Sequence, residues 1–206
     1  MRTTPDPAPD LTGYEVLVAV CGGIAAYKVC EVVSDLVQSG AGVTVAMTRA
    51  ARRFVGPLTF QALSGRPVLT SLWAAPDPGD VQHITRTEAA DLLVVAPATA
   101  NMIAKMALGL ADDLVSTLLV SAASPVLVAP AMNNRMWAHP AVQRNVERLT
   151  EAGCTILGPA EGWLACRSIG PGRMVEARDL FERAVQLLRA HPAKATEAKR
   201  RSDIAT

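Results

Sequence analysis

The sequence predicts an α/β protein with a three-layer, doubly wound parallel sheet, in which helices cover both faces of the sheet. Short, continuous apolar runs recur along the chain, as is typical of strands buried on both faces. Segments with helical periodicity separate these runs, so strands and helices alternate. The 206 residues are enough for one such domain with a complete core, and no internal repeat is present.

The elements follow from periodicity and from stop signals. Strands are expected at 15–20, 43–47, 91–97, 125–130 and 154–159. Helices are expected at 24–38, within 52–65, at 100–122 with a break near Gly109, at 139–152 and at 176–190. Residues 160–174 are expected to form a loop, because Gly162, Gly170, Pro171 and Gly172 interrupt any regular element.

The domain organisation is expected to be simple: a flexible leader at 1–13, a single domain at 14–190 and a basic flexible tail at 191–206. The net charge of +1 and the 4% aromatic content argue against nucleic-acid binding. No apolar run approaches the roughly 20 residues that cross a membrane. The leader lacks the apolar core of a secretory signal, so a cytoplasmic location is expected.

The four cysteines show no metal-binding spacing, so no metal site is expected. Cys21, Cys30 and Cys154 lie in or beside apolar runs, where cysteine behaves as a small buried hydrophobe. Cys166 differs, because it lies in the glycine-rich segment with Arg167 beside it, and this setting favours a lowered thiol pKa and a functional role.

Polar and glycine residues follow the predicted strands, where doubly wound sheets bind ligands. Gly22 and Gly23 precede a helix and suit a phosphate, although a tight turn alone also requires glycine. Thr99, Asn101 and Asn133 are either helix caps or a polar ledge that fits a planar heterocycle; periodicity does not identify the cofactor. The local pattern leaves open whether His83 is structural or catalytic.

Three motifs in order carry a resemblance to a known family. PATAN (97–101), PAMNNRMW (130–137) and ACRSIGPGRM (165–174) resemble the flavin, substrate and substrate-clamp motifs of the homo-oligomeric flavin-containing cysteine decarboxylases. The likeness covers roughly residues 14–188 and is nearest to the phosphopantothenoylcysteine decarboxylase branch. It implies a flavodoxin/Rossmann-like flavoprotein that binds FMN and forms homotrimers or dodecamers.

The resemblance also implies roles for individual residues. His83 is expected to be the catalytic base or proton relay, and Cys166 the late proton donor. Asn133 is expected to bind the substrate carboxylate, with Met136 and Arg173 as further substrate-binding residues. The expected cofactor-binding residues are Gly22, Gly23, Ile24, Thr48, Phe54, Thr99, Ala100, Asn101 and Met102.

The implied reaction converts 4′-phospho-N-pantothenoylcysteine into 4′-phosphopantetheine, through thioaldehyde and enethiol intermediates, in coenzyme A biosynthesis. The alternatives are a peptidyl-cysteine decarboxylase, a non-catalytic flavin-binding regulatory protein and a prenylated-flavin synthase. The chain departs from the family pattern in two places: Met102 replaces a threonine and Arg167 replaces a glycine. Many bacterial relatives carry a fused synthetase domain, so a stand-alone or separated decarboxylase is expected.

Overall fold

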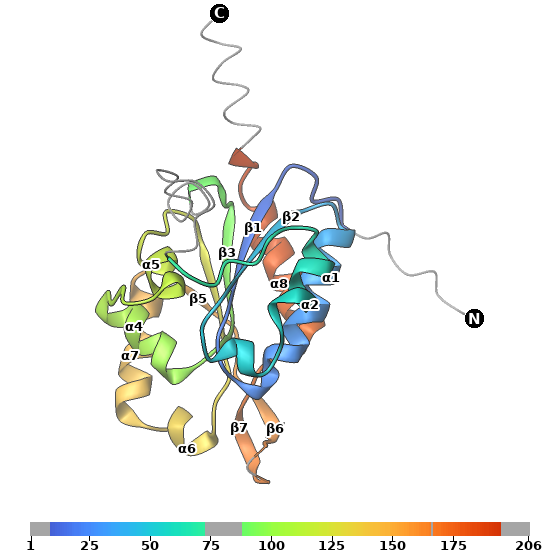
Figure 1. Cartoon of the computed structure of the whole chain (residues 1–206). Helices are drawn as coiled ribbons and strands as arrows, with labels where there is room; N and C mark the ends of the chain where they lie inside the picture. Colours follow the sequence, from blue (N-terminus) through green and yellow to red (C-terminus); the bar gives the residue numbers. More distant parts are fainter. Residues whose placement is uncertain (1–8, 73–87, 166, 195–206) are drawn as a thin grey trace, which may run out of the picture.

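The computed structural model describes residues 9–72, 88–165 and 167–194 (Figure 1). Five parallel strands form its main sheet, in the order β2-β1-β3-β4-β5. The strands are β1 (Glu15–Val20), β2 (Gly42–Met47), β3 (Leu92–Ala98), β4 (Val126–Pro130) and β5 (Thr155–Ile156). All five agree in position with the predicted strands, and β5 is shorter than predicted.

Helices cover both faces of this sheet and complete the predicted three layers (Figure 1). One face carries α1 (Val29–Gln38), α2 (Pro57–Ser64) and α8 (Ala177–Arg189). The other face carries α4 (Ala100–Leu108), α5 (Leu114–Val120) and α7 (Pro140–Glu151). Two short 3-10 helices, η1 (Ile24–Lys28) and η2 (Ala51–Arg53), follow β1 and β2. The predicted break near Gly109 separates α4 from α5.

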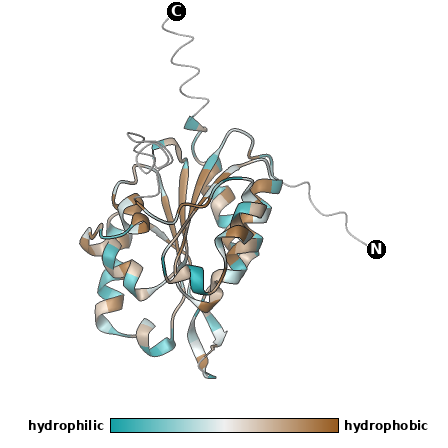
Figure 2. Cartoon of the chain, in the orientation of Figure 1, coloured by the Kyte–Doolittle hydropathy of each residue, from teal (hydrophilic) through white to brown (hydrophobic). Residues whose placement is uncertain are grey.

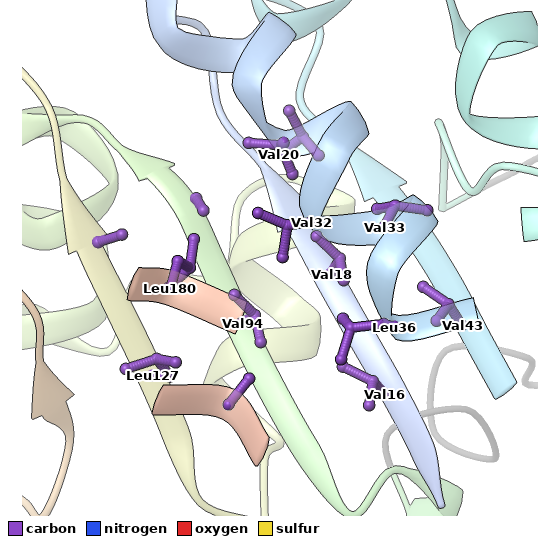
Figure 3. Close-up of a cluster of buried hydrophobic side chains, with 14 of the residues drawn as sticks. Val16, Val18, Val20, Val32, Val33, Leu36, Val43, Val94, Leu127 and Leu180 are labelled. Carbon is purple, nitrogen blue, oxygen red and sulfur yellow. The ribbon is translucent and has the colours of Figure 1, made fainter. Parts of the chain in front are cut away.

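Strand β1 shows why its sequence is apolar throughout. Successive side chains of a strand point to opposite faces of the sheet. Val16, Val18 and Val20 join the buried cluster under α1 and α8, which Figure 3 shows. Leu17 and Ala19 join the second cluster, under α4, α5 and α7. In Figure 2 the strands accordingly form a hydrophobic layer between helices with polar outer faces. Each face of β1 therefore helps to build a separate half of the core.

The strand order fixes where a ligand site can form. The chain moves from β1 outward to β2 and then returns to the other side of β1 to form β3. This reversal is the topological switch point at which doubly wound sheets bind ligands, outside the carboxyl ends of their strands. The loops after β1, β2, β3 and β4 leave the sheet at that one edge, which lies at the bottom of Figure 1.

The loop predicted at 160–174 is wrong in part. Strands β6 (Ala160–Trp163) and β7 (Ile169–Arg173) form an antiparallel two-stranded hairpin that projects below the sheet in Figure 1. Glycines often indicate a loop, but in a strand glycine also marks the close approach of another backbone. A short helix, α6 (Asn134–Trp137), was not predicted and contacts β7.

The described residues at both ends of the chain pack against the domain. Leu11 is fully buried, and its N–H donates to the Ser39 carbonyl oxygen at 2.7 Å. The Lys194 backbone N–H donates to the Asp91 carboxylate at 2.7 Å, and its ammonium donates to Ser124 Oγ at 2.7 Å. The leader and tail boundaries remain predictions, although ordered contacts extend beyond the predicted limits of residues 14–190.

Candidate functional site

The loop after β1 approaches the loop after β2 too closely for a side chain at Gly22. A Cβ at Gly22 would overlap Ala50, which directly precedes η2. Gly23 follows in an extended conformation, with Pro97 of β3 in ordinary van der Waals contact range of a Cβ placed there. Gly22 and Gly23 thus let the loops after β1 and β2 and the end of β3 approach one another at the switch point, where doubly wound sheets bind ligands.

The loops after β1 and β2 also expose apolar side chains. Thr48 Oγ1 accepts a hydrogen bond from the Ala51 backbone N–H at 3.1 Å and so orders the turn into η2. Phe54, directly after η2, is 49% exposed, and Ile24 at the start of η1 is 61% exposed. Exposed apolar groups beside glycine loops suit a ligand that has both a polar and an aromatic part.

The loop after β3 leads directly into helix α4. Thr99 is the N-cap, and its side chain accepts a hydrogen bond from the Met102 N–H at 3.3 Å. Ala100 is half-buried and Asn101 is exposed in the first turn. The Met102 side chain is 1% exposed and packs into the core under α4. The start of the helix therefore places residues 99–101 at the sheet edge. Met102, which replaces the threonine of the family motif, lies in the core.

The loop after β4 continues the same edge. The Ala131 N–H donates to the Ala98 carbonyl oxygen at 3.0 Å, so the ends of β3 and β4 are joined. Asn133 caps α6, and its side-chain oxygen accepts a hydrogen bond from the Arg135 N–H at 2.8 Å. Met136 is 48% exposed on α6. The segments after β3 and β4, which contain Asn101 and Asn133 and are expected to form one polar surface, are thus adjacent.

The β6–β7 hairpin packs directly on this loop. The Met132 N–H donates to the Gly172 carbonyl oxygen at 2.9 Å. A Cβ at Gly172, where φ is +148°, would overlap the Met132 carbonyl oxygen. At Gly170 a Cβ would lie 3.2 Å from Asn134 Nδ2. The glycines of β7 therefore let the hairpin seat against the loop that contains Asn133.

Arg173 ends β7 and takes part in a three-membered ion-pair cluster. Its Nη2 lies 2.9 Å from Glu176 Oε1, and Lys28 Nζ lies 2.8 Å from Glu176 Oε2. The Lys28 hydrogen bond, followed by the charges of Lys28 and Arg173, holds the pKa of Glu176 below its usual value. Part of the Arg173 guanidinium is thus engaged by Glu176 before any ligand binds.

The described cysteines are structural. Burial raises the pKa of the Cys21 thiol to about 12, even though the Thr99 backbone N–H hydrogen-bonds to it. Burial also raises the pKa of Cys30 and of Cys154. Because the thiolate is the reactive form, burial makes these three thiols less reactive than a free cysteine. The prediction of a buried hydrophobe therefore holds for Cys21, whereas Cys30 and Cys154 are only partly buried and pack against the edges of the two core clusters.

Two predicted catalytic residues, His83 and Cys166, lie outside the described residues. On either side of Cys166, the Leu164 N–H donates to the Ser168 carbonyl oxygen at 2.8 Å, and the Arg167 N–H donates to the Leu164 carbonyl oxygen at 2.9 Å. Arg167 has a φ of +62°, the left-handed conformation that glycine adopts most readily. Arg167 thus adopts a backbone conformation that suits the glycine found at this position in the family motif.

Sequence reasoning missed four residues that shape the edge: Lys28, Ala50, Met132 and Glu176. Ala50 is a small residue shortly after a strand, which is a weak signal for a close approach. Glu176 is the first residue of the helix predicted at 176–190, where an acidic residue normally indicates a helix start. Across the described ranges, no group of three or more His, Cys, Asp or Glu side chains could hold a metal ion. No helix there is long and apolar enough to cross a membrane.

Fold and site together define a doubly wound α/β protein with a ligand site at the switch point of its sheet. The Flavoprotein family model matches residues 6–189, and the chain belongs to that family. It is 48% identical over 188 residues to the coenzyme A biosynthesis bifunctional protein CoaBC of Bacillus subtilis (strain 168), covering 91% of this chain and 45% of that protein. The chain therefore spans about half the length of the curated relatives it matches.

Two solved structures superimpose closely. One is a PPC decarboxylase cysteine-to-serine mutant complexed with pantothenoylaminoethenethiol, with a TM-score of 0.76 and 30% identity, covering 86% of this chain and 99% of that chain. The other is the FMN-dependent cysteine decarboxylase SpaF, with a TM-score of 0.72 and 35% identity, covering 84% and 99%. The resemblance predicted from the three motifs, and the predicted fold class, are confirmed.

Proposed function

We propose that this protein catalyses the FMN-dependent decarboxylation of 4′-phospho-N-pantothenoylcysteine to 4′-phosphopantetheine, a step of coenzyme A biosynthesis. The observation that carries the proposal is the edge built by the β1, β2, β3 and β4 loops, against which the hairpin packs through Met132 and Gly172. Similarity to CoaBC, and to a PPC decarboxylase over almost the whole of that chain, supports the choice of substrate.

FMN fits the residues present at this edge. A glycine loop precedes η1, and Gly22 in this loop has no room for a side chain because a Cβ there would overlap Ala50. Backbone N–H groups of such loops bind phosphate oxygens. Ile24 and Phe54 expose apolar surface that suits an aromatic ring system. We propose that these residues bind FMN together with Gly23, Thr48, Thr99, Ala100, Asn101 and the Met102 segment.

When bound, FMN supplies a reversible hydride acceptor, which makes loss of CO₂ from an unactivated cysteine possible. We assign carboxylate binding to Asn133 and packing of the substrate to Met136. Arg173 retains guanidinium donors beyond its Glu176 contact and supplies positive charge to an anionic substrate. His83 would move the proton during oxidation of the substrate, and Cys166 would donate the last proton to carbon.

The proposal includes a location and an assembly. The described cysteines are free thiols, which fits a reducing compartment, and we assign the protein to the cytoplasm. We further propose a homo-oligomer, a trimer or a tetramer of trimers. The paired hairpin residues Trp163 and Ile169 support this assembly, because they are 64% and 71% exposed and form an adjacent apolar surface that a second subunit could cover.

A competition experiment tests the substrate. The purified chain loaded with FMN is given equal amounts of 4′-phospho-N-pantothenoylcysteine and a peptide that ends in cysteine, and both products are followed by mass spectrometry. Preferential conversion of the phosphorylated substrate supports the proposal. Preferential conversion of the peptide would reassign the chain to peptidyl-cysteine decarboxylation, and FMN binding without turnover of either would indicate a regulatory protein.

A further inference from the structure

Glu176 joins the two halves of the candidate site. Its Oε2 accepts a hydrogen bond from Lys28 Nζ at 2.8 Å, and its Oε1 lies 2.9 Å from Arg173 Nη2. Each carboxylate oxygen thus holds a different cation. Lys28 ends η1, the short helix that follows the Gly22–Gly23 loop, and Arg173 ends β7 of the hairpin. One side chain therefore connects the glycine loop to the hairpin.

The position of Glu176 makes this arrangement informative. Glu176 is the N-cap of α8, but its side chain accepts no hydrogen bond from the first turn of that helix. A carboxylate at an N-cap normally accepts from the N–H of the second or third helical residue. At this position that local interaction is given up, and both oxygens bind cations from other elements. The Glu176 side chain therefore joins separate elements and does not cap α8.

The ion pair with Lys28 is shielded from water on one side only, because the Lys28 side chain is 17% exposed and the Glu176 side chain is 52% exposed. Its contribution to global stability should therefore be small, and its effect is expected in the local position of the joined segments. The Arg173 guanidinium also lies close to Gly162 of β6, because a Cβ placed on that glycine would be 3.4 Å from the guanidinium carbon. The guanidinium thus lies between Glu176 and the facing strand of its own hairpin.

The neighbouring residue completes the anchor. Gly172 accepts a hydrogen bond from the Met132 N–H, and Arg173 follows it directly in β7. Consecutive residues of the hairpin are therefore fixed to two different elements, the loop after β4 and the start of α8. Loss of the Glu176 contact would leave the Met132–Gly172 hydrogen bond as the remaining polar anchor among these contacts.

We propose that Glu176 is a positioning residue that holds the β6–β7 hairpin in a fixed position relative to the Gly22–Lys28 segment. The substrate-binding and cofactor-binding segments then keep a constant geometry. The functional part of this inference rests on the proposed decarboxylase activity. The structural part, restraint of the hairpin by Glu176, does not depend on any substrate.

Amide hydrogen exchange of the purified full chain tests the restraint directly. The Met132 N–H reports seating of the hairpin, because its acceptor is the Gly172 carbonyl oxygen. The Leu93 N–H, which donates to the Pro125 carbonyl oxygen, reports the sheet instead. In Glu176→Ala the Met132 amide should exchange roughly tenfold faster, with Leu93 unchanged, because local opening is separate from global unfolding.

A matched control lies on the same helix. Glu182 pairs with Arg178 at 2.8 Å, an exposed contact within α8, so Glu182→Ala removes a carboxylate without touching the hairpin. It should leave both exchange rates within about twofold of the parent. Unchanged Met132 exchange in Glu176→Ala, or an equal acceleration at Met132 and Leu93, would overturn the proposal, since either result leaves no specific hold on the hairpin.

The functional consequence is tested by product composition in the FMN-loaded protein. A loosened hairpin should raise the share of unsaturated, decarboxylated product relative to 4′-phosphopantetheine in Glu176→Ala, because the last proton transfer depends on the hairpin. A uniform fall in rate with the same product ratio contradicts that consequence. If the parent protein shows no turnover, the proposed function fails while the Met132 exchange result still decides the restraint.

Discussion

The Met132 backbone N–H donates to the Gly172 carbonyl oxygen at 2.9 Å, and this contact seats the β6–β7 hairpin against the loop that follows β4. Gly172 lacks the Cβ that would overlap the Met132 carbonyl oxygen. The hairpin segment that resembles a substrate clamp is therefore fixed to the loop that resembles a substrate-binding motif. The close approach explains why a glycine-rich segment forms strands here.

Gly172→Ala should loosen this seat and raise the KM for substrate by about tenfold, since overpacking against a backbone atom costs roughly 1–3 kcal/mol. Gly153→Ala is the matched control, because Gly153 also has a positive φ, +90°, but no atom within 4 Å of an added Cβ. Steady-state kinetics on both variants separates the close approach from backbone strain. Equal KM values for the two variants would contradict the assigned contact.

Gly22→Ala should weaken FMN binding, because its Cβ would overlap Ala50 and push the β1 and β2 loops apart. An affinity loss of about tenfold or more is expected, from roughly 1–3 kcal/mol of overpacking. Titration followed by quenching of flavin fluorescence measures the effect. Gly56→Ala, with open space around its added Cβ, should bind FMN like the parent. Normal affinity in Gly22→Ala would mean that the glycine loop does not shape the flavin site.

The ionised carboxylate of Asp113 should stabilise the folded protein at neutral pH, and this stabilisation should be lost in acid. Burial opposes its ionisation, but hydrogen bonds from Lys105 and from the Ser116 N–H outweigh burial and hold its pKa below 3.8. A lowered folded-state pKa stabilises the protein above the usual value, and this stabilisation is lost as the pH falls through the folded-state pKa.

Asp113→Ala should therefore cost about 1–2 kcal/mol near neutral pH through loss of the cap, and less in acid. Urea unfolding at several pH values measures the difference. Asp112→Ala is the control, because Asp112 is 66% exposed and does not cap α5, so a smaller loss is expected. A cost for Asp113→Ala that stays constant down to low pH would contradict the account.

Arg167→Gly should stabilise the protein by up to about 1 kcal/mol, because Arg167 adopts a φ of +62°, which glycine tolerates without steric cost. The gain is limited by the greater freedom of glycine in the unfolded chain. Differential scanning calorimetry would detect it as a higher Tm. A lower Tm would indicate that the arginine side chain makes stabilising contacts that outweigh the backbone strain.

Cys166→Ser should still release CO₂ from 4′-phospho-N-pantothenoylcysteine but accumulate the unsaturated enethiol product, because serine is a much weaker proton donor than cysteine. Chromatography with mass detection distinguishes the two products. Cys154→Ser, at a partly buried thiol whose pKa is raised by burial, should make the saturated product as the parent does. Saturated product formed at the normal rate by Cys166→Ser would remove the role assigned to that thiol.

Much of the fold follows from local sequence, since runs such as residues 16–20 are buried on both faces of the sheet and Gly109 ends a helix. The hairpin could not be predicted, because its glycines serve contacts with Met132 and Asn134, which are distant in sequence. The cluster of Lys28, Arg173 and Glu176 is hidden for the same reason: each residue looks like an ordinary charged residue until the fold joins them.

The candidate site was predictable to a different degree at each strand end. The segments after β1, β3 and β4 reach one edge, as expected from the parallel sheet. The motifs after β3 and β4, together with the motif at 165–174, predict the family that the family model confirms. The core position of Met102 could not be read from the motif, because helical periodicity near a cap does not separate a buried first turn from an exposed one. The roles of His83 and Cys166 remain predictions.

The most direct test of the central claim is the mass of the product made from 4′-phospho-N-pantothenoylcysteine by the purified, FMN-loaded chain. The proposed function predicts release of one CO₂ per substrate and the appearance of 4′-phosphopantetheine, with no product when FMN is removed. Substrate recovered unchanged by a protein that has bound FMN would contradict it.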